Sequence, residues 1–166
     1  MKARSIFTVT IAVAAAVAAA ATAAGTGPSA SGAGHVTISG ANRTFSFTAG
    51  QYTNGSVKGQ AELHARQFPV GLPQGAFGHM EIDCLRVTGN IAIMSGTFTS
   101  SSLPVIVDAG GIFAVEDNGN GGKPAADRMS EVLVEGLDYV DSSLDCSNTS
   151  PARTLAVERG DITVRS

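Results

Sequence analysis

The chain has 166 residues, of which 11 are basic and 14 acidic, giving a formal net charge of −3. This balance argues against partners that are bound through a concentrated positive patch, so we expect no nucleic-acid partner. The length suits a single domain with its own apolar core.

The N-terminus has the order of charge, apolar core and small residues that is typical of a secretory signal peptide. Lys2 and Arg4 precede an alanine-rich run that ends in "ATAAG". We expect a signal peptide over residues 1–24, cleaved after Ala23 or Ala24, and a secreted or periplasmic protein. A membrane anchor is the alternative, but the run falls short of the ~20 strongly apolar residues that a span requires. We therefore expect no membrane insertion after cleavage.

Residues 25–34, "GTGPSASGAG", contain no bulky apolar side chain. Such a segment buries too little surface to offset the entropy of ordering. We predict a flexible leader here, followed by a single β domain over residues 35–166.

From residue 35 onward, short runs of Val, Ile, Phe and Thr alternate with Gly, Asn, Pro and Ser. This pattern predicts an all-β domain of about eight antiparallel strands. In "RTFSFTA", Phe45 and Phe47 would share the buried face. The strands could form an up-and-down barrel or a two-layer sandwich, since both architectures protect sheet edges.

A polar row follows two of the expected strands at a spacing of two residues. Glu62 and His64 lie in "GQAELHAR", and His79, Glu81 and Asp83 lie in "HMEID". If the two strands pair, these side chains could converge to bind zinc or to perform acid–base chemistry. The alternative is an ordinary solvated sheet face.

The second of these strands also begins an expected hairpin. "HMEIDCLRV" and "NIAIMSGTFTSS" flank the short link Thr88 to Asn90, in which Gly89 suits a positive φ.

The chain has two cysteines, Cys84 and Cys146. In an exported protein they are expected to form a disulfide, and two buried free thiols are the alternative. Closing this loop of about 60 residues would stabilise the fold by roughly 4 kcal/mol.

The stretch "VEDNGNGGKPAAD" has oxygen-bearing residues at a spacing reminiscent of a calcium loop. Counting from Glu116, the candidate ligands are Asp117, Asn118, Asn120 and Asp127. Glu116 and Asp127 interchange the usual first and last residue types, and a strand rather than a helix precedes the loop. A connecting turn without an ion explains the same residues. We expect no cofactor, and calcium in this loop is the alternative.

Residues 128–140 fit two kinds of secondary structure. Met129, Val132, Leu133, Leu137 and Val140 have helical spacing, whereas Val132 and Val134 alternate with Glu131, Leu133 and Glu135 as in a strand. We favour the strand, because the segment follows a glycine-rich turn.

No nucleophile elbow, phosphate loop or dinucleotide-binding motif is present. The main expectation is therefore an exported, non-enzymatic β domain that binds a partner, a surface or a small ligand. A secreted hydrolase or metal-dependent enzyme using the His/Glu/Asp group is one alternative. A lipocalin-like carrier is another, since seven Phe and no Trp leave few large groups to fill a barrel.

Several segments resemble a group of small exported bacterial proteins with no assigned biochemical role. They are "GQAELHAR", "HMEIDCLRVTGNIAIMSGTFTS", "FAVEDNGNGG" with "ADRMS", and "RGDITVR". The resemblance covers most of residues 43–166. It implies a β domain and assigns no catalytic residue to this chain.

Overall fold

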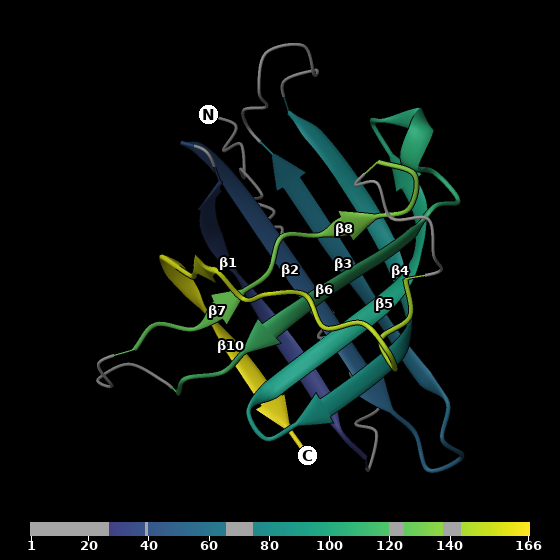
Figure 1. The fold of residues 1–166 in the computed structure, drawn as a ribbon, viewed down its shortest axis with the longest axis vertical. Helices are drawn as coiled ribbons and strands as arrows, with labels where there is room; N and C mark the ends of the chain where they lie inside the picture. Colours follow the sequence, from purple (N-terminus) through teal and green to yellow (C-terminus); the bar gives the residue numbers. More distant parts are fainter. Residues whose placement is uncertain (1–26, 39, 66–74, 120–124, 138–143) are drawn as a thin grey trace, which may run out of the picture.

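The computed structural model describes residues 27–38, 40–65, 75–119, 125–137 and 144–166. These residues form one antiparallel sheet of ten strands in the order β10-β1-β2-β3-β4-β5-β6-β7-β9, with β8 also paired to β6 (Figure 1). The strands and a 3-10 turn, η1, are β1 (Ser29–Ile38), β2 (Ala41–Gln51), β3 (Val57–Ala65), β4 (Ala76–Thr88), β5 (Ile91–Ser101), η1 (Pro104–Ile106), β6 (Gly110–Glu116), β7 (Arg128–Met129), β8 (Leu133–Val134), β9 (Leu155–Ala156) and β10 (Arg159–Arg165).

The predicted all-β fold is confirmed. From β1 to β6, strands that follow one another in the chain also lie side by side in the sheet. The sheet curls into a half-barrel, so β2 faces β6 across the interior (Figure 1). The Phe47 ring packs edge-on against that of Phe113, with ring centroids 5.6 Å apart. A half-barrel is compatible with both architectures that the sequence left open.

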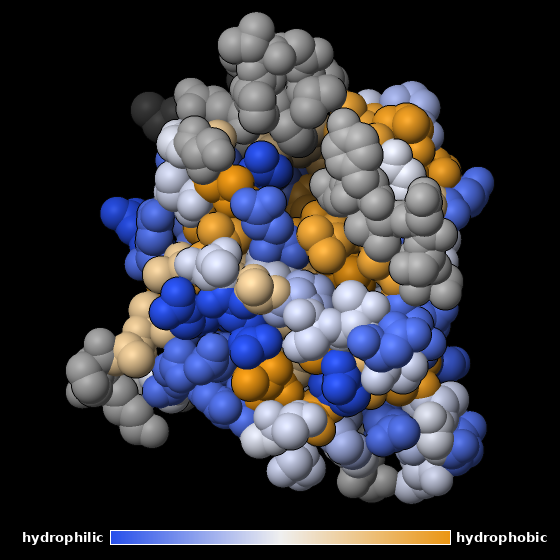
Figure 2. Space-filling model, viewed as in Figure 1, coloured by the Kyte–Doolittle hydropathy of each residue, from blue (hydrophilic) through white to orange (hydrophobic). Residues whose placement is uncertain are grey.

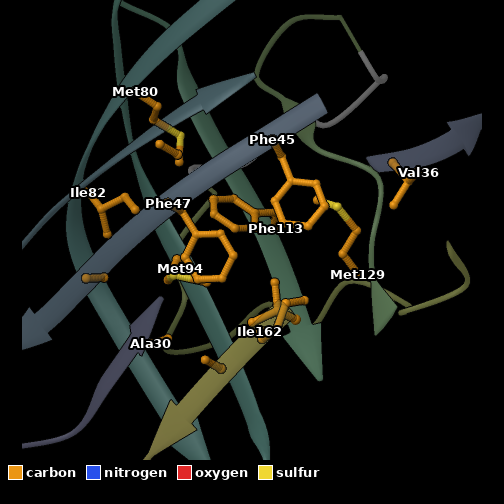
Figure 3. Close-up of a cluster of buried hydrophobic side chains, with 14 of the residues drawn as sticks. Ala30, Val36, Phe45, Phe47, Met80, Ile82, Met94, Phe113, Met129 and Ile162 are labelled. Carbon is orange, nitrogen blue, oxygen red and sulfur yellow. The ribbon is translucent and has the colours of Figure 1, made fainter. Parts of the chain in front are cut away.

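The main core lies on the concave face of this sheet (Figure 3). Phe45 and Phe47 are 5% and 6% exposed, as their alternation predicts. The largest side chains that pack with them are Met80, Ile82, Met94, Phe98, Phe113, Val115 and Ile162. Burying each large apolar side chain contributes about 1.5–3 kcal/mol, so this layer is the main source of stability.

The prediction of a flexible leader over residues 25–34 is wrong for residues 29–34, which belong to β1. β1 pairs with both β2 and β10. A Cβ on Gly34 would lie 2.6 Å from the carbonyl oxygen of Arg159 and 3.1 Å from the Phe45 ring. The small residues are therefore needed for close strand packing, and the neighbouring side chains supply the apolar surface that β1 lacks.

Two other local predictions agree with the structure. β4 and β5 form the expected hairpin, with Thr88 paired to Ile91 and φ of +61° at Gly89. The strand interpretation of residues 128–140 is confirmed for β7 and β8, which are short because the chain leaves the sheet between them. Residues 138–140 lie outside the described part of the chain. Within the described residues, no helix is long and apolar enough to cross a membrane.

Candidate functional site

A hollow of about 320 Å³ opens at one end of the half-barrel. Strands β2, β3 and β4 form one wall through side chains on their concave face, among them Phe45, Leu63 and Ala76. Segments around η1, β7 and β8 form the opposite wall. The other apolar residues of the lining are Val36, Ile38, Ala65, Phe77, Phe98, Leu103, Ile106, Met129, Val132, Val134, Leu137 and Leu155. Figure 2 shows apolar side chains gathered in the upper half of the face crossed by β8.

A few polar residues also line the hollow, namely Arg43, Thr44, His64, Ser130 and Glu131. Arg43 lies two residues before Phe45 on β2 and so has the same inward register, and its guanidinium carries N–H donors. The Ser130 hydroxyl accepts the N–H of Ala114 and donates to the carbonyl of Glu131, so it serves the local backbone. The lining of the hollow is thus mainly apolar and includes a few charged and polar groups.

The structure brings three of the five predicted polar residues together on the convex face. β3 pairs with β4, and Glu62 lies directly opposite His79. The Glu62 carboxylate lies 3.8 Å from Nδ1 of His79 and 4.0 Å from Nε2 of His64. We call Glu62, His64 and His79 the outer histidine group.

The other two predicted residues lie further along the same face. Glu81 is paired with Gln60, one exposed position beyond Glu62. Asp83 follows the last pair between β3 and β4, Gly59 with Ile82. The row of five therefore contains a compact group of three and two separate carboxylates.

The candidate calcium residues take part in hydrogen bonds to the backbone. Asp127 is 8% exposed; its Oδ1 accepts the N–H of Asn118 and its Oδ2 the N–H of Ile162, both at 2.8 Å. Asp117 accepts the N–H groups of Gly119 and Val164. These bonds give both aspartates a structural role that needs no ion.

The other two candidate ligands are Asn118 and Asn120. The Asn118 side chain donates to the carbonyl of Ala126, which holds the two ends of the loop together. Asn120 lies outside the described residues. Calcium binding stays a prediction.

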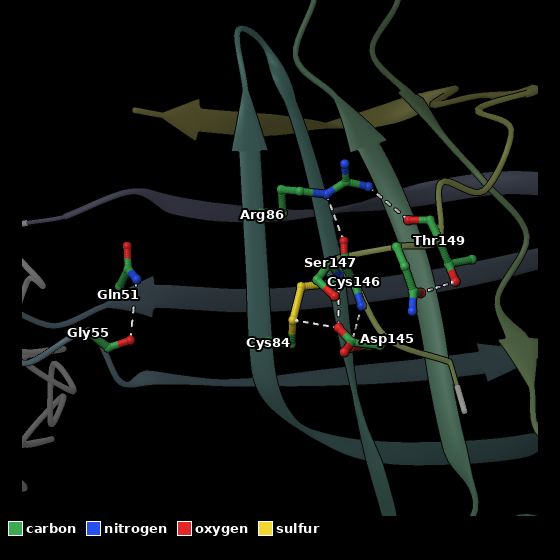
Figure 4. Close-up of a disulfide and its surroundings, with 10 residues drawn as sticks. Gln51, Gly55, Cys84, Arg86, Asp145, Cys146, Ser147 and Thr149 are labelled. Atoms are coloured by element: carbon green, nitrogen blue, oxygen red, sulfur yellow. Dashed lines mark hydrogen bonds between the residues drawn. A yellow bond between two sulfur atoms is a disulfide. The ribbon is translucent and has the colours of Figure 1, made fainter. Parts of the chain in front are cut away.

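The predicted disulfide between Cys84 and Cys146 is present, with Cα atoms 5.9 Å apart. It fastens residues 144–149, which we call the strap, to the convex face of the sheet (Figure 4). Leu144 and Cys146 pack there against Ile93, Ile112 and Ala114. The sheet is therefore covered on both faces around β5 and β6.

Polar contacts hold the strap in the same place. The Arg86 guanidinium donates to the carbonyls of Cys146 at 2.7 Å and Thr149 at 3.0 Å. Asp145 accepts the N–H of Ser147 and lies 3.4 Å from the sulfur of Cys84. Cys84, Asp145 and Cys146 are thus close together, but the disulfide occupies both sulfurs, so no thiolate remains to bind a metal.

Sequence reasoning did not identify the hollow or Arg43. The sequence did contain an indication of Arg43. It lies two residues before Phe45 and four before Phe47, so in a strand it points to the face that was predicted to be buried. The opposite wall comes from residues about 60 to 110 positions further along the chain. No local sequence pattern predicts that these distant residues lie opposite β2, β3 and β4.

Comparisons of the chain with protein-family models, with curated proteins and with solved structures give no match.

Proposed function

We propose that this protein is an exported, non-enzymatic β domain that binds a small, mainly apolar molecule in the hollow. The observation that carries the proposal is the cavity itself, which has a continuous apolar lining and a few polar groups. This combination is typical of small-molecule sites, where apolar contacts supply affinity and polar groups fix orientation.

The volume limits the size of the ligand. Small-molecule pockets commonly measure roughly 300–1,000 Å³, and this hollow lies at the lower end of that range. A compact ring system or a medium-length acyl chain suits such a space. Each Å² of apolar surface that leaves water contributes about 25 cal/mol, so a ligand of this size can bind without many hydrogen bonds.

Export fits the same proposal. The N-terminal pattern predicts a signal peptide, and disulfides persist in oxidising compartments outside the cytoplasm. A carrier in such a compartment shields an apolar molecule from water. The proposal thus combines the expected binding domain with the lipocalin-like alternative, on the strength of an observed cavity.

A pocket-filling variant tests the proposal. Ala76 is 2% exposed and lines the hollow, so Ala76→Leu would place three extra carbons in it. We expect this variant to bind the fluorescent probe 8-anilinonaphthalene-1-sulfonate at least about tenfold more weakly than the wild type, because the larger side chain and the probe would occupy the same space. Titration of probe fluorescence, with cooperative urea unfolding as the check on folding, measures this.

The matched control is Ala33→Leu. Ala33 lies on β1 and is exposed, so the same addition there leaves the hollow unchanged. Probe binding should equal that of the wild type. Equal affinity for wild type and a folded Ala76→Leu variant would show that the hollow is not the binding site.

A further inference from the structure

We propose that the outer histidine group, Glu62, His64 and His79, binds one zinc ion on the convex face of the sheet. This site is separate from the interior of the hollow, although His64 also borders the rim. The inference goes beyond small-molecule binding and follows from strand register, donor chemistry and exposure.

Register places the three side chains on one face. Glu62 and His64 are two residues apart on β3, so both point to the same side. His79 on β4 is directly opposite Glu62 and diagonal to His64. Cβ atoms of directly opposed residues lie about 4.5–5.5 Å apart and those of diagonal neighbours about 7–8 Å, within reach of long side chains. Two positions on one strand and one on its neighbour thus form a triangle of donors.

The donor set suits zinc. Two imidazoles and one carboxylate are a recognised three-ligand set for Zn²⁺, with a fourth position left for water. Both imidazoles lie beside the same carboxylate, at 3.8 and 4.0 Å. With metal–ligand bonds of about 2.0–2.1 Å, neighbouring ligands of a tetrahedral zinc lie about 3.3 Å apart, so each imidazole must move about 0.5–0.7 Å closer to the carboxylate. The two imidazoles must also turn toward each other by changes of rotamer.

Exposure allows this adjustment. The side chains of Glu62, His64 and His79 are 57%, 53% and 32% exposed. Exposed side chains change rotamer on the picosecond-to-nanosecond timescale, so the donors can turn toward one ion without a change in the sheet. The rigid β3–β4 pairing beneath them fixes their Cα positions.

The third histidine provides a matched control. His35 is exposed on β1, on the same convex face, and its Cα is paired with Thr44, which is paired in turn with His64. It is thus two strands away from the outer histidine group. His35→Ala removes one imidazole from the face without removing a proposed ligand.

The experiment is isothermal titration of the tag-free, disulfide-intact protein with zinc chloride. We expect one ion per chain for the wild type and for His35→Ala. His64→Ala, His79→Ala and Glu62→Gln should each bind more than about tenfold more weakly, since loss of second-shell partners alone already costs 10–100-fold. Cobalt should show the visible absorption bands of a nitrogen- and oxygen-ligated ion, and these bands should be lost in the same three variants.

Several results would overturn the site. They are an absence of heat at millimolar zinc, a stoichiometry of half an ion per chain, or folded His64→Ala and His79→Ala variants that bind zinc as the wild type does. Probe binding in the hollow should be unchanged in Glu62→Gln, so the two proposals can fail independently.

Discussion

The carboxylate of Asp127 connects three separate parts of the chain. It lies at the start of β7 and accepts N–H groups from the loop after β6 and from β10. Among the described residues β10 is the last strand of the sheet, so alternate N–H groups along its outer edge have no neighbouring strand there. Asp127 and Asp117 accept two of them, at Ile162 and Val164. Side-chain acceptors thus satisfy the backbone where strand pairing ends.

We predict that Asp127→Asn lowers the free energy of unfolding by about 2 kcal/mol, because a carboxylate that accepts one buried and one part-buried hydrogen bond through its two oxygens is replaced by an amide with one oxygen and an NH2 group. Urea unfolding followed by circular dichroism measures the change. Asp83→Asn is the control, since Asp83 is exposed on β4 and its variant should match the wild type.

A loss of stability in Asp127→Asn that occurs only when calcium is present would contradict this structural role. The sequence correctly indicated that oxygen acceptors matter in this loop. It could not distinguish an ion from backbone N–H groups as their partner, because both require the same oxygens, and two of the four N–H groups come from residues 35 and 47 positions away.

At the scale of the element, β1 depends on its glycines. Gly34 is directly opposite Gly160 of β10, whose φ is +121°. A Cβ on Gly34 would meet the backbone oxygen of Arg159 at 2.6 Å and a methyl group of Val157 at 2.9 Å. The strand can approach its neighbours this closely only because it has no side chain at this position.

Gly34→Ala should therefore lower the free energy of unfolding by about 1–3 kcal/mol through overpacking against backbone that cannot rotate away. Urea unfolding measures this change, and we expect a lower midpoint concentration with an unchanged slope of free energy against urea concentration. Gly50→Ala in β2 is the matched control, because the nearest atom to its added Cβ would be 4.0 Å away. A Gly34→Ala variant as stable as Gly50→Ala would refute the packing argument.

β1 also shows why some strands cannot be predicted from their own sequence. Composition measures the apolar surface that a segment carries, and residues 29–34 carry little. The surface that orders β1 belongs to Phe45, Phe47 and Ile162 on the neighbouring strands. By contrast, the β4–β5 hairpin and the buried face of β2 were predictable, because turn chemistry and alternation are local signals.

On the scale of the whole molecule, curvature of one sheet creates both proposed sites. The concave face holds the core and, at one open end, the hollow. The convex face carries the outer histidine group and is covered by the strap where β5 and β6 would otherwise expose apolar residues. The disulfide was predictable from two cysteines in a chain whose N-terminus predicts export. The hollow was not, because its walls meet only after the sheet has curled.

Amide NMR can show whether a small apolar molecule binds in the hollow. Titration of the isotope-labelled protein with 8-anilinonaphthalene-1-sulfonate should shift the amides of Phe45, Leu63 and Phe98, which line the hollow. The amides of Ala33 and Asp83, on the convex face, should not move. Shifts confined to the convex face, or no shifts at saturating probe, would show that the hollow is not a binding site.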